Sequence, residues 1–188
     1  MRIRKKIIFL FISLFLILNL NSCKQESITV YCEEGKFSIP FGKPIDYTDI
    51  CVKRVVDGDT LVLESGERVR LIGIDTPEMH ESKKLYKDAQ RTKEDISTIQ
   101  KLGRRAYVFT KDLVEGKRLS LEFDVERFDA YKRLLAYAYL KDGTFVNAEI
   151  VKQGYASLMT IQPNTKYADL FLKLYQQARE NKKGLWGR

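Results

Sequence analysis

The sequence predicts a mostly β protein with helices, in the form of a five-stranded OB-type barrel packed with about three helices. Short strand-like segments alternate with two-residue turn signals between residues 51 and 140, a pattern typical of an antiparallel barrel. One helical segment falls between the third and fourth of these strands, and two more follow the last strand. Hydrophobic residues make up 44% of the 188 residues, which is enough to build a core and excludes a disordered chain.

The first 22 residues are predicted to be a signal peptide. Four basic residues precede the apolar run from Ile7 to Leu20, and this run is shorter than the roughly 20 residues that a bilayer-spanning helix needs. Leu20-Asn21-Ser22-Cys23 resembles a bacterial lipobox, so we expect cleavage before Cys23 and a membrane anchor through a lipid on this cysteine. A secreted or signal-anchored protein is the alternative. All these interpretations of the N-terminal segment place the protein in the cell envelope, outside the cytoplasm.

Residues 23–49 are predicted to form a lipid-anchored tether and an irregular N-terminal extension, because glycines and prolines interrupt the stretch without sustained periodicity. The folded domain is expected to span residues 50–188. Cys32 and Cys51 remain as a pair in a compartment where disulfides persist, and they either form a bridge or stay as two free thiols.

The domain is expected to begin with a meander of three antiparallel strands, over residues 51–56, 60–64 and 68–74. Asp57-Gly58 and Ser65-Gly66 supply the turns between them. Residues 79–100 carry many charges and few apolar side chains, so we predict a long surface loop there and assign no role to the histidine within it.

The second half of the domain supplies the remaining elements. We predict a helix over 102–114, strands over 118–124 and 133–140, a tight hairpin turn at Asp142-Gly143, a return strand beginning at Phe145-Val146, and helices over 148–153 and 167–181. Trp186 is expected to pack on the barrel.

Four carboxylates flank the first and third predicted strands, and they indicate a site for a hard cation. Asp57 and Asp59 lie in the first turn, and Asp75 and Glu78 follow the third strand. Converging carboxylates repel one another unless a cation lies among them, and oxygen ligands favour calcium or magnesium over zinc. The sequence has no cysteine and histidine pattern with zinc spacing, no glycine-rich phosphate loop and no nucleophilic serine elbow.

Three separated segments together resemble the signature of staphylococcal nuclease-like domains. They are Val56-Asp57-Gly58-Asp59-Thr60, the run from Arg70 to Glu78, and Arg133-Leu134-Leu135-Ala136-Tyr137. The resemblance covers the chain from about residue 51 to its end, and it agrees with a net charge of +8 that suits a polyanionic substrate. It implies a calcium-dependent endonuclease that hydrolyses phosphodiester bonds of DNA and RNA and leaves 3′-phosphate ends, acting as a monomer.

By this resemblance, calcium binds to the carboxylates of Asp59 and Asp75 and to the backbone carbonyl of Thr76. Glu78 corresponds to the general base, and Arg70 and Arg133 correspond to the arginines that contact the phosphate. Tyr131 matches a tyrosine near the nucleotide pocket, although an aromatic residue in this position is also consistent with packing alone. Asp57 keeps only a supporting, turn-forming role.

The sequence departs from the family pattern in three places. The segment between Glu78 and the first helix is about a dozen residues longer than in the best-known member, Lys132 replaces a common glycine, and residues 157–161 lack tyrosines. The alternatives are a non-catalytic envelope lipoprotein that binds nucleic acid, and a protein-binding OB module. Retention of the acids and of both arginines favours the enzyme.

Overall fold

The computed structural model describes residues 27–32, 35–40 and 46–187, which belong to two units that divide at Ile45. The predicted signal peptide and Cys23 lie outside the described residues. The first unit contains a two-stranded antiparallel hairpin of β1 (Ser27–Cys32) and β2 (Gly35–Pro40). This hairpin lies where the sequence suggested irregular structure. In the described part of the chain, no helix combines the length and the apolar character that a membrane span requires.

The second unit is built on a closed barrel of five strands, as predicted. The strands are β3 (Ile50–Asp57), β4 (Thr60–Leu63), β5 (Arg68–Leu71), β7 (Arg118–Glu122) and β8 (Leu134–Leu140). Their order around the barrel is β3-β4-β5-β8-β7. Neighbours are antiparallel except β5 and β8, which run parallel with Arg70 opposite Leu135. Side chains such as Leu61, Leu63 and Leu134 fill the interior and are almost completely buried.

Glycine at position 73 bends the chain where the sequence predicted one continuous strand. The third predicted strand is divided into β5 and β6 (Gly73–Asp75), and Gly73 has a φ of +83° between them. A Cβ at this position would lie 2.5 Å from the ring of Phe171. β6 then pairs with β9 (Ser157–Met159), a short strand that the sequence did not predict. The bend turns Asp75 back toward Arg70, with 3.1 Å between Arg70 Nη2 and Asp75 Oδ1.

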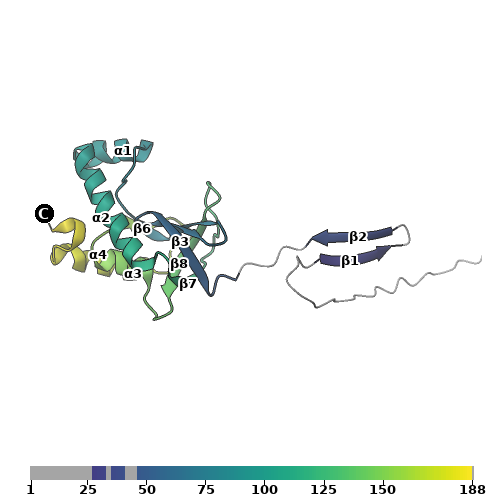
Figure 1. Cartoon of the computed structure of the whole chain (residues 1–188). Coiled ribbons are helices and arrows are strands. Elements are labelled where there is room, and N and C mark those ends of the chain that lie inside the picture. The colour runs from purple at the N-terminus through teal and green to yellow at the C-terminus, as the bar shows by residue number, and fades with distance from the viewer. Residues whose placement is uncertain (1–26, 33–34, 41–45, 188) are drawn as a thin grey trace, which may run out of the picture. The chain divides into compact units, whose positions relative to one another are not determined.

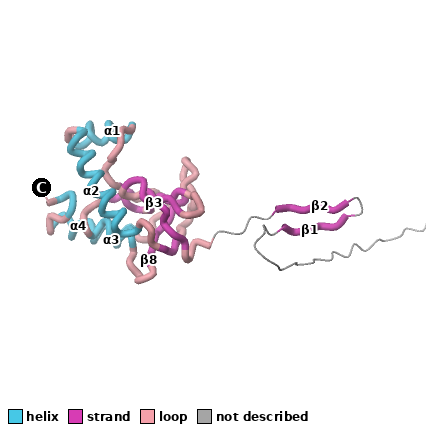
Figure 2. Tube along the Cα trace, viewed as in Figure 1, coloured by secondary structure: helices cyan, strands magenta, loops and turns pink. Residues whose placement is uncertain are grey.

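The predicted surface loop over 79–100 is wrong, because most of it is helical. Helix α1 (Lys83–Thr92) is capped by the Ser82 hydroxyl, and α2 (Ile96–Val114) begins after the capping side chain of Asp95. These caps satisfy backbone donors that the charged sequence would otherwise expose. Figure 1 shows α1 across the N-terminal end of α2, and Figure 2 shows that the helices of this unit gather on one side of the barrel.

The C-terminal part contains two further α-helices, α3 (Val146–Lys152) and α4 (Ala168–Glu180), and the short 3₁₀ turn η1 (Gly184–Trp186). The return strand predicted at Phe145-Val146 is wrong, because Phe145 caps α3 and Val146 is already helical. The ring of Trp186, predicted to pack on the barrel, contacts Tyr175 and Arg179 of α4. With α1, the described residues hold four α-helices instead of about three.

The predicted bridge between Cys32 and Cys51 stays a prediction. Cys51 lies in β3 and is half-buried, and within the described residues its sulfur forms no disulfide. The side chain of Cys32 lies outside the described residues.

Candidate active site

The turn between β3 and β4 fixes the first predicted metal ligand. Asp57 Oδ1 accepts a hydrogen bond of 3.1 Å from the backbone amide of Asp59, which gives Asp57 the turn-forming role expected of it. Asp59 is 5% exposed, and its Oδ2 accepts bonds from the backbone amide and the hydroxyl of Thr76, at 2.8 and 3.1 Å. These bonds hold the turn against the segment that carries Asp75 and Thr76.

Helix α2 supports both segments of this site from behind. The hydroxyl of Thr110 donates a 2.8 Å hydrogen bond to the carbonyl of Gly58. Gly103, seven residues earlier, lets the backbone of Pro77 and Glu78 lie directly on the helix, because a Cβ at Gly103 would come within 2.6 Å of that backbone. A single rigid helix therefore sets the position of Asp59 relative to Glu78.

Arg70 joins the two predicted calcium-binding carboxylates. Its Nη1 lies 3.1 Å from Asp59 Oδ1, and its Nη2 lies 3.1 Å from Asp75 Oδ1. The Arg70 side chain is only 12% exposed, so these ion pairs are shielded from solvent and weakly screened by salt. The planar guanidinium group can contact both acids at once, which an ammonium group cannot do with the same geometry.

Lys84 brings a second cation into the same cluster. Its Nζ lies 3.2 Å from Asp75 Oδ1, 3.0 Å from Glu78 Oε1 and 3.1 Å from the carbonyl oxygen of Thr76. The sequence interpretation assigned no role to Lys84, because it lay within the predicted loop. Only the packing of α1 reveals it.

Excess negative charge marks this cluster. Burial and the neighbouring charge of Asp59 raise the pKa of Asp57 to about 7. Burial also raises the pKa of Asp75, with a further contribution from Asp59, even though Lys84 and Arg70 act against the shift. Both shifts come mainly from burial, so the charged carboxylates have lost solvation that a divalent cation could replace.

The oxygen atoms at this cluster fit a hard cation. Asp59 Oδ1, Asp75 Oδ1 and the carbonyl of Thr76 all contact cationic nitrogens, and a carboxylate and carbonyl set of this kind is what calcium prefers. Within residues 46–187, no group of three or more histidine, cysteine, aspartate or glutamate side chains is arranged to hold a metal. The candidate ligand set therefore relies on a main-chain carbonyl and leaves several positions for water or substrate.

Arg133 lies on a separate turn and faces the same surface as Arg70. Asp129 fixes it: Oδ2 accepts the Arg133 Nε–H at 2.7 Å, and Oδ1 accepts the backbone amides of Tyr131 and Arg133, both at 2.9 Å. This tight turn places Lys132 at a φ of +61°, which explains why glycine is common there in the family. The sequence interpretation missed Asp129, although an acid four residues before an arginine in a short polar turn was a readable signal.

A pocket of about 360 Å³ connects the two arginines. Arg70 and Arg133 both contribute to its wall, as do Phe128, Tyr131 and Ile161. Tyr131 is 82% exposed, and its ring lies 5.5 Å from the guanidinium carbon of Arg133. The predicted residues therefore form a continuous series from Tyr131 and Arg133, through Arg70, to the acids.

Comparison with known proteins shows the family of this chain. Residues 68–188 match the family model described as staphylococcal nuclease homologue. A thermonuclease of Staphylococcus intermedius is 37% identical over 140 residues, which cover 73% of this chain and 75% of that protein. A thermonuclease of Staphylococcus hyicus is 33% identical over 163 residues, covering 85% and 88%. The SPbeta prophage-derived endonuclease YokF of Bacillus subtilis is 38% identical over 148 residues, covering 76% of this chain but 45% of that protein. The chain belongs to the staphylococcal nuclease family.

Proposed function

We propose that this protein is a calcium-dependent endonuclease that hydrolyses phosphodiester bonds of DNA and RNA. The observation that carries the proposal is the position of Arg70, which contacts both predicted calcium-binding carboxylates and lines the same pocket as Arg133. A phosphate held by both arginines would therefore lie beside the cation. The names of the relatives, thermonuclease and endonuclease, support the same activity.

Glu78 is the proposed general base. Its Oε2 lies 3.4 Å from the Ser82 hydroxyl, and the backbone of this residue rests against α2, so the carboxylate has a fixed place beside the cation cluster. It would accept a proton from a water molecule that attacks phosphorus. Calcium bound to Asp59, Asp75 and the Thr76 carbonyl would supply positive charge to the phosphate oxygens.

The two arginines are proposed to stabilise the charge that develops on the phosphate in the transition state. Asp129 occupies the Nε–H of Arg133, and within the described residues no hydrogen bond is formed by its two Nη groups. Those groups are therefore available to a substrate phosphate in a bidentate contact. Arg70 would approach the same phosphate from the side of the carboxylates.

The pocket beside the arginines suits an unpaired base. Phe128, Tyr131 and Ile161 are all strongly exposed, at 57%, 82% and 63%, although they lie at a polar catalytic surface. Aromatic and apolar side chains at such a position stack on bases without regard to sequence. We therefore propose that single strands or frayed duplex are the substrates.

We further propose that the enzyme works as a monomer outside the cytoplasm. The support for the location is sequence alone: an N-terminal segment typical of export signals and the lipobox-like residues Leu20 to Cys23. The monomer is what the resemblance to the family implies. Loss of membrane association in a Cys23→Ala variant would support the lipid anchor, and unchanged association would favour an uncleaved signal anchor.

Analysis of the reaction products tests the proposed hydrolysis. The purified protein, incubated with calcium and an internally labelled single-stranded DNA or RNA, should cut within the strand and leave 3′-phosphate ends. Such ends block polymerase extension until a phosphatase removes them. Strands that stay intact while binding normally would favour the non-catalytic nucleic-acid-binding lipoprotein, and indifference to nucleic acid would favour the protein-binding module.

A further inference from the structure

The ammonium group of Lys84 contacts two of the three atoms that we propose as calcium ligands. Nζ lies 3.2 Å from Asp75 Oδ1 and 3.1 Å from the Thr76 carbonyl. It also contacts Glu78 Oε1, at 3.0 Å, and lies 3.6 Å from Asp88 Oδ2. Four oxygens therefore surround one nitrogen, which resembles the coordination shell of a small cation more than an ordinary surface ion pair.

Calcium and this ammonium group would compete for the same oxygens. Calcium binds oxygen at about 2.3–2.6 Å and carries two charges, so an ammonium donating to those atoms would compete for their lone pairs and repel the ion. Because the ammonium group contacts two of the proposed ligand atoms, it has to move away before calcium binds them.

We propose that Lys84 is an internal competitor for the calcium site, and that helix α1 carries it as a lid which closes the site until calcium displaces it. This inference rests on the proposed function, because it assumes that Asp75 and the Thr76 carbonyl bind the cation. It assigns a regulatory role to the segment that is longer here than in the best-known family member.

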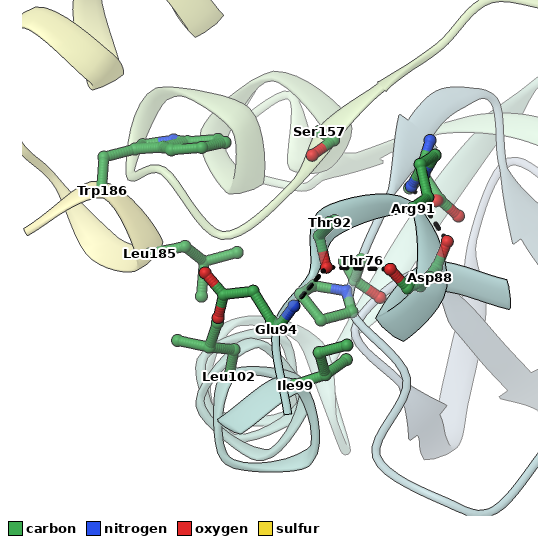
Figure 3. A pocket seen from close by; sticks show the side chains of 12 residues that line it. Thr76, Asp88, Arg91, Thr92, Glu94, Ile99, Leu102, Ser157, Leu185 and Trp186 are labelled. Carbon is green, nitrogen blue, oxygen red and sulfur yellow. Dashed lines mark hydrogen bonds and ion pairs between the residues drawn. The ribbon is translucent and has the colours of Figure 1, made fainter. Parts of the chain in front are cut away.

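The packing of α1 suits a movable element. Leu85 is its only fully buried side chain, and the Ser82 hydroxyl caps the helix through the amide of Leu85. Figure 3 shows Asp88, Arg91 and Thr92 of α1 facing a pocket of about 230 Å³, with Ile99, Leu102 and Trp186 on the other walls. Helix α1 therefore has space beside it, and a small apolar contact holds it in place together with the ion pairs of Lys84.

Displacement of Lys84 would also release Glu78. In the closed arrangement the same ammonium group holds Asp75, the Thr76 carbonyl and Glu78. Calcium binding would thus free the proposed base in the same step that completes the site, so that Glu78 becomes available only when the cation is present.

Calorimetric titration with calcium, without nucleic acid, tests the competition directly. If the open form makes up about 10% of the calcium-free protein, removing the competitor should tighten the apparent Kd about tenfold. We expect that change in Lys84→Met. Lys83→Met is the matched control, because Lys83 is the exposed neighbour on the same helix and its loss removes the same charge. We expect at most about a twofold change there.

Lysine acetylation of the unmodified protein gives a second readout that does not depend on a variant folding correctly. Mass spectrometry should find Lys84 protected without calcium and at least several-fold more reactive at saturating calcium, with Lys83 equally reactive in both states. Equal Kd values for the two variants, or a calcium-independent reactivity of Lys84 in protein that binds calcium, would overturn the lid. If neither the unmodified protein nor Lys84→Met binds calcium, the proposed calcium site itself is wrong, and the lid fails with it.

Discussion

Replacing Glu78 with glutamine is expected to lower kcat by about 10²–10⁴, the range that a positioned general base contributes. Glutamine keeps the shape of the side chain but cannot accept the proton of the attacking water. The backbone of Glu78 lies against Gly103 of α2, and this contact does not depend on the carboxylate. We therefore expect the loss in single-turnover cleavage of DNA, with little change in the melting temperature.

Glu81→Gln is the matched control for this change. Glu81 lies three residues further along the same segment and is exposed, so its substitution removes one negative charge near the site without touching the reaction. Its cleavage rate should stay within about twofold of the unmodified protein. A loss of less than tenfold in Glu78→Gln would show that another group, or bulk water, accepts the proton.

Replacing Arg133 with lysine is expected to lower kcat/KM by about 10²–10³, although the charge is kept, because lysine cannot reproduce a bidentate contact with phosphate. Asp129 holds Arg133 through Nε, which directs the two Nη groups away from this acid, and a lysine has no equivalent fork. If the contact forms only in the transition state, the loss should appear in kcat rather than in KM.

The exposed Arg68 gives a matched control on β5, since Arg68→Lys makes the same chemical change two residues from Arg70. Its kinetics should be unchanged. Asp129→Asn adds a graded test. Its single amide oxygen can replace only one of the two carboxylate oxygens, so either the turn amides or the Arg133 Nε–H loses its acceptor, and we expect an intermediate loss. Full activity in Arg133→Lys would mean that this residue supplies only charge.

The barrel was predictable because its strands carry their signals locally. Alternating apolar residues and the turns at Asp57-Gly58 and Ser65-Gly66 define three strands, although the chain bends at Gly73 and divides the third. Helix α1 was missed because its stability comes from capping and from one buried leucine rather than from an apolar face that composition reveals. A short apolar run, such as the one after Asp142-Gly143, is compatible with a strand or with a helix. Tertiary packing makes this run the start of helix α3. In the helix, Asn147 bonds to the Ile72 carbonyl and the Ala138 amide.

Some residues of the candidate site were also predictable from the sequence, and others were not. Its acids and arginines were predicted from the order of separated motifs, and the structure brings Asp59, Asp75 and Arg70 into direct contact. Lys84 and Asp129 were not predicted. The contacts of Lys84 depend on where a helix packs, and the role of Asp129 depends on a turn that holds Lys132 at positive φ. The packing of a helix is not present in a local pattern of residue types, whereas the acid four residues before Arg133 was a local signal that the sequence interpretation missed.

Calcium titration of the cleavage rate tests the central claim most directly, with the unmodified protein and Asp75→Asn measured side by side on single-stranded DNA. Asp75 contributes an oxygen to the proposed cation site and contacts both Arg70 and Lys84. The account predicts no cleavage in the presence of chelator, saturable activation by calcium, and a half-activating concentration at least about tenfold higher in the variant. Cleavage that persists with chelator, or identical calcium dependence in the two proteins, would contradict it.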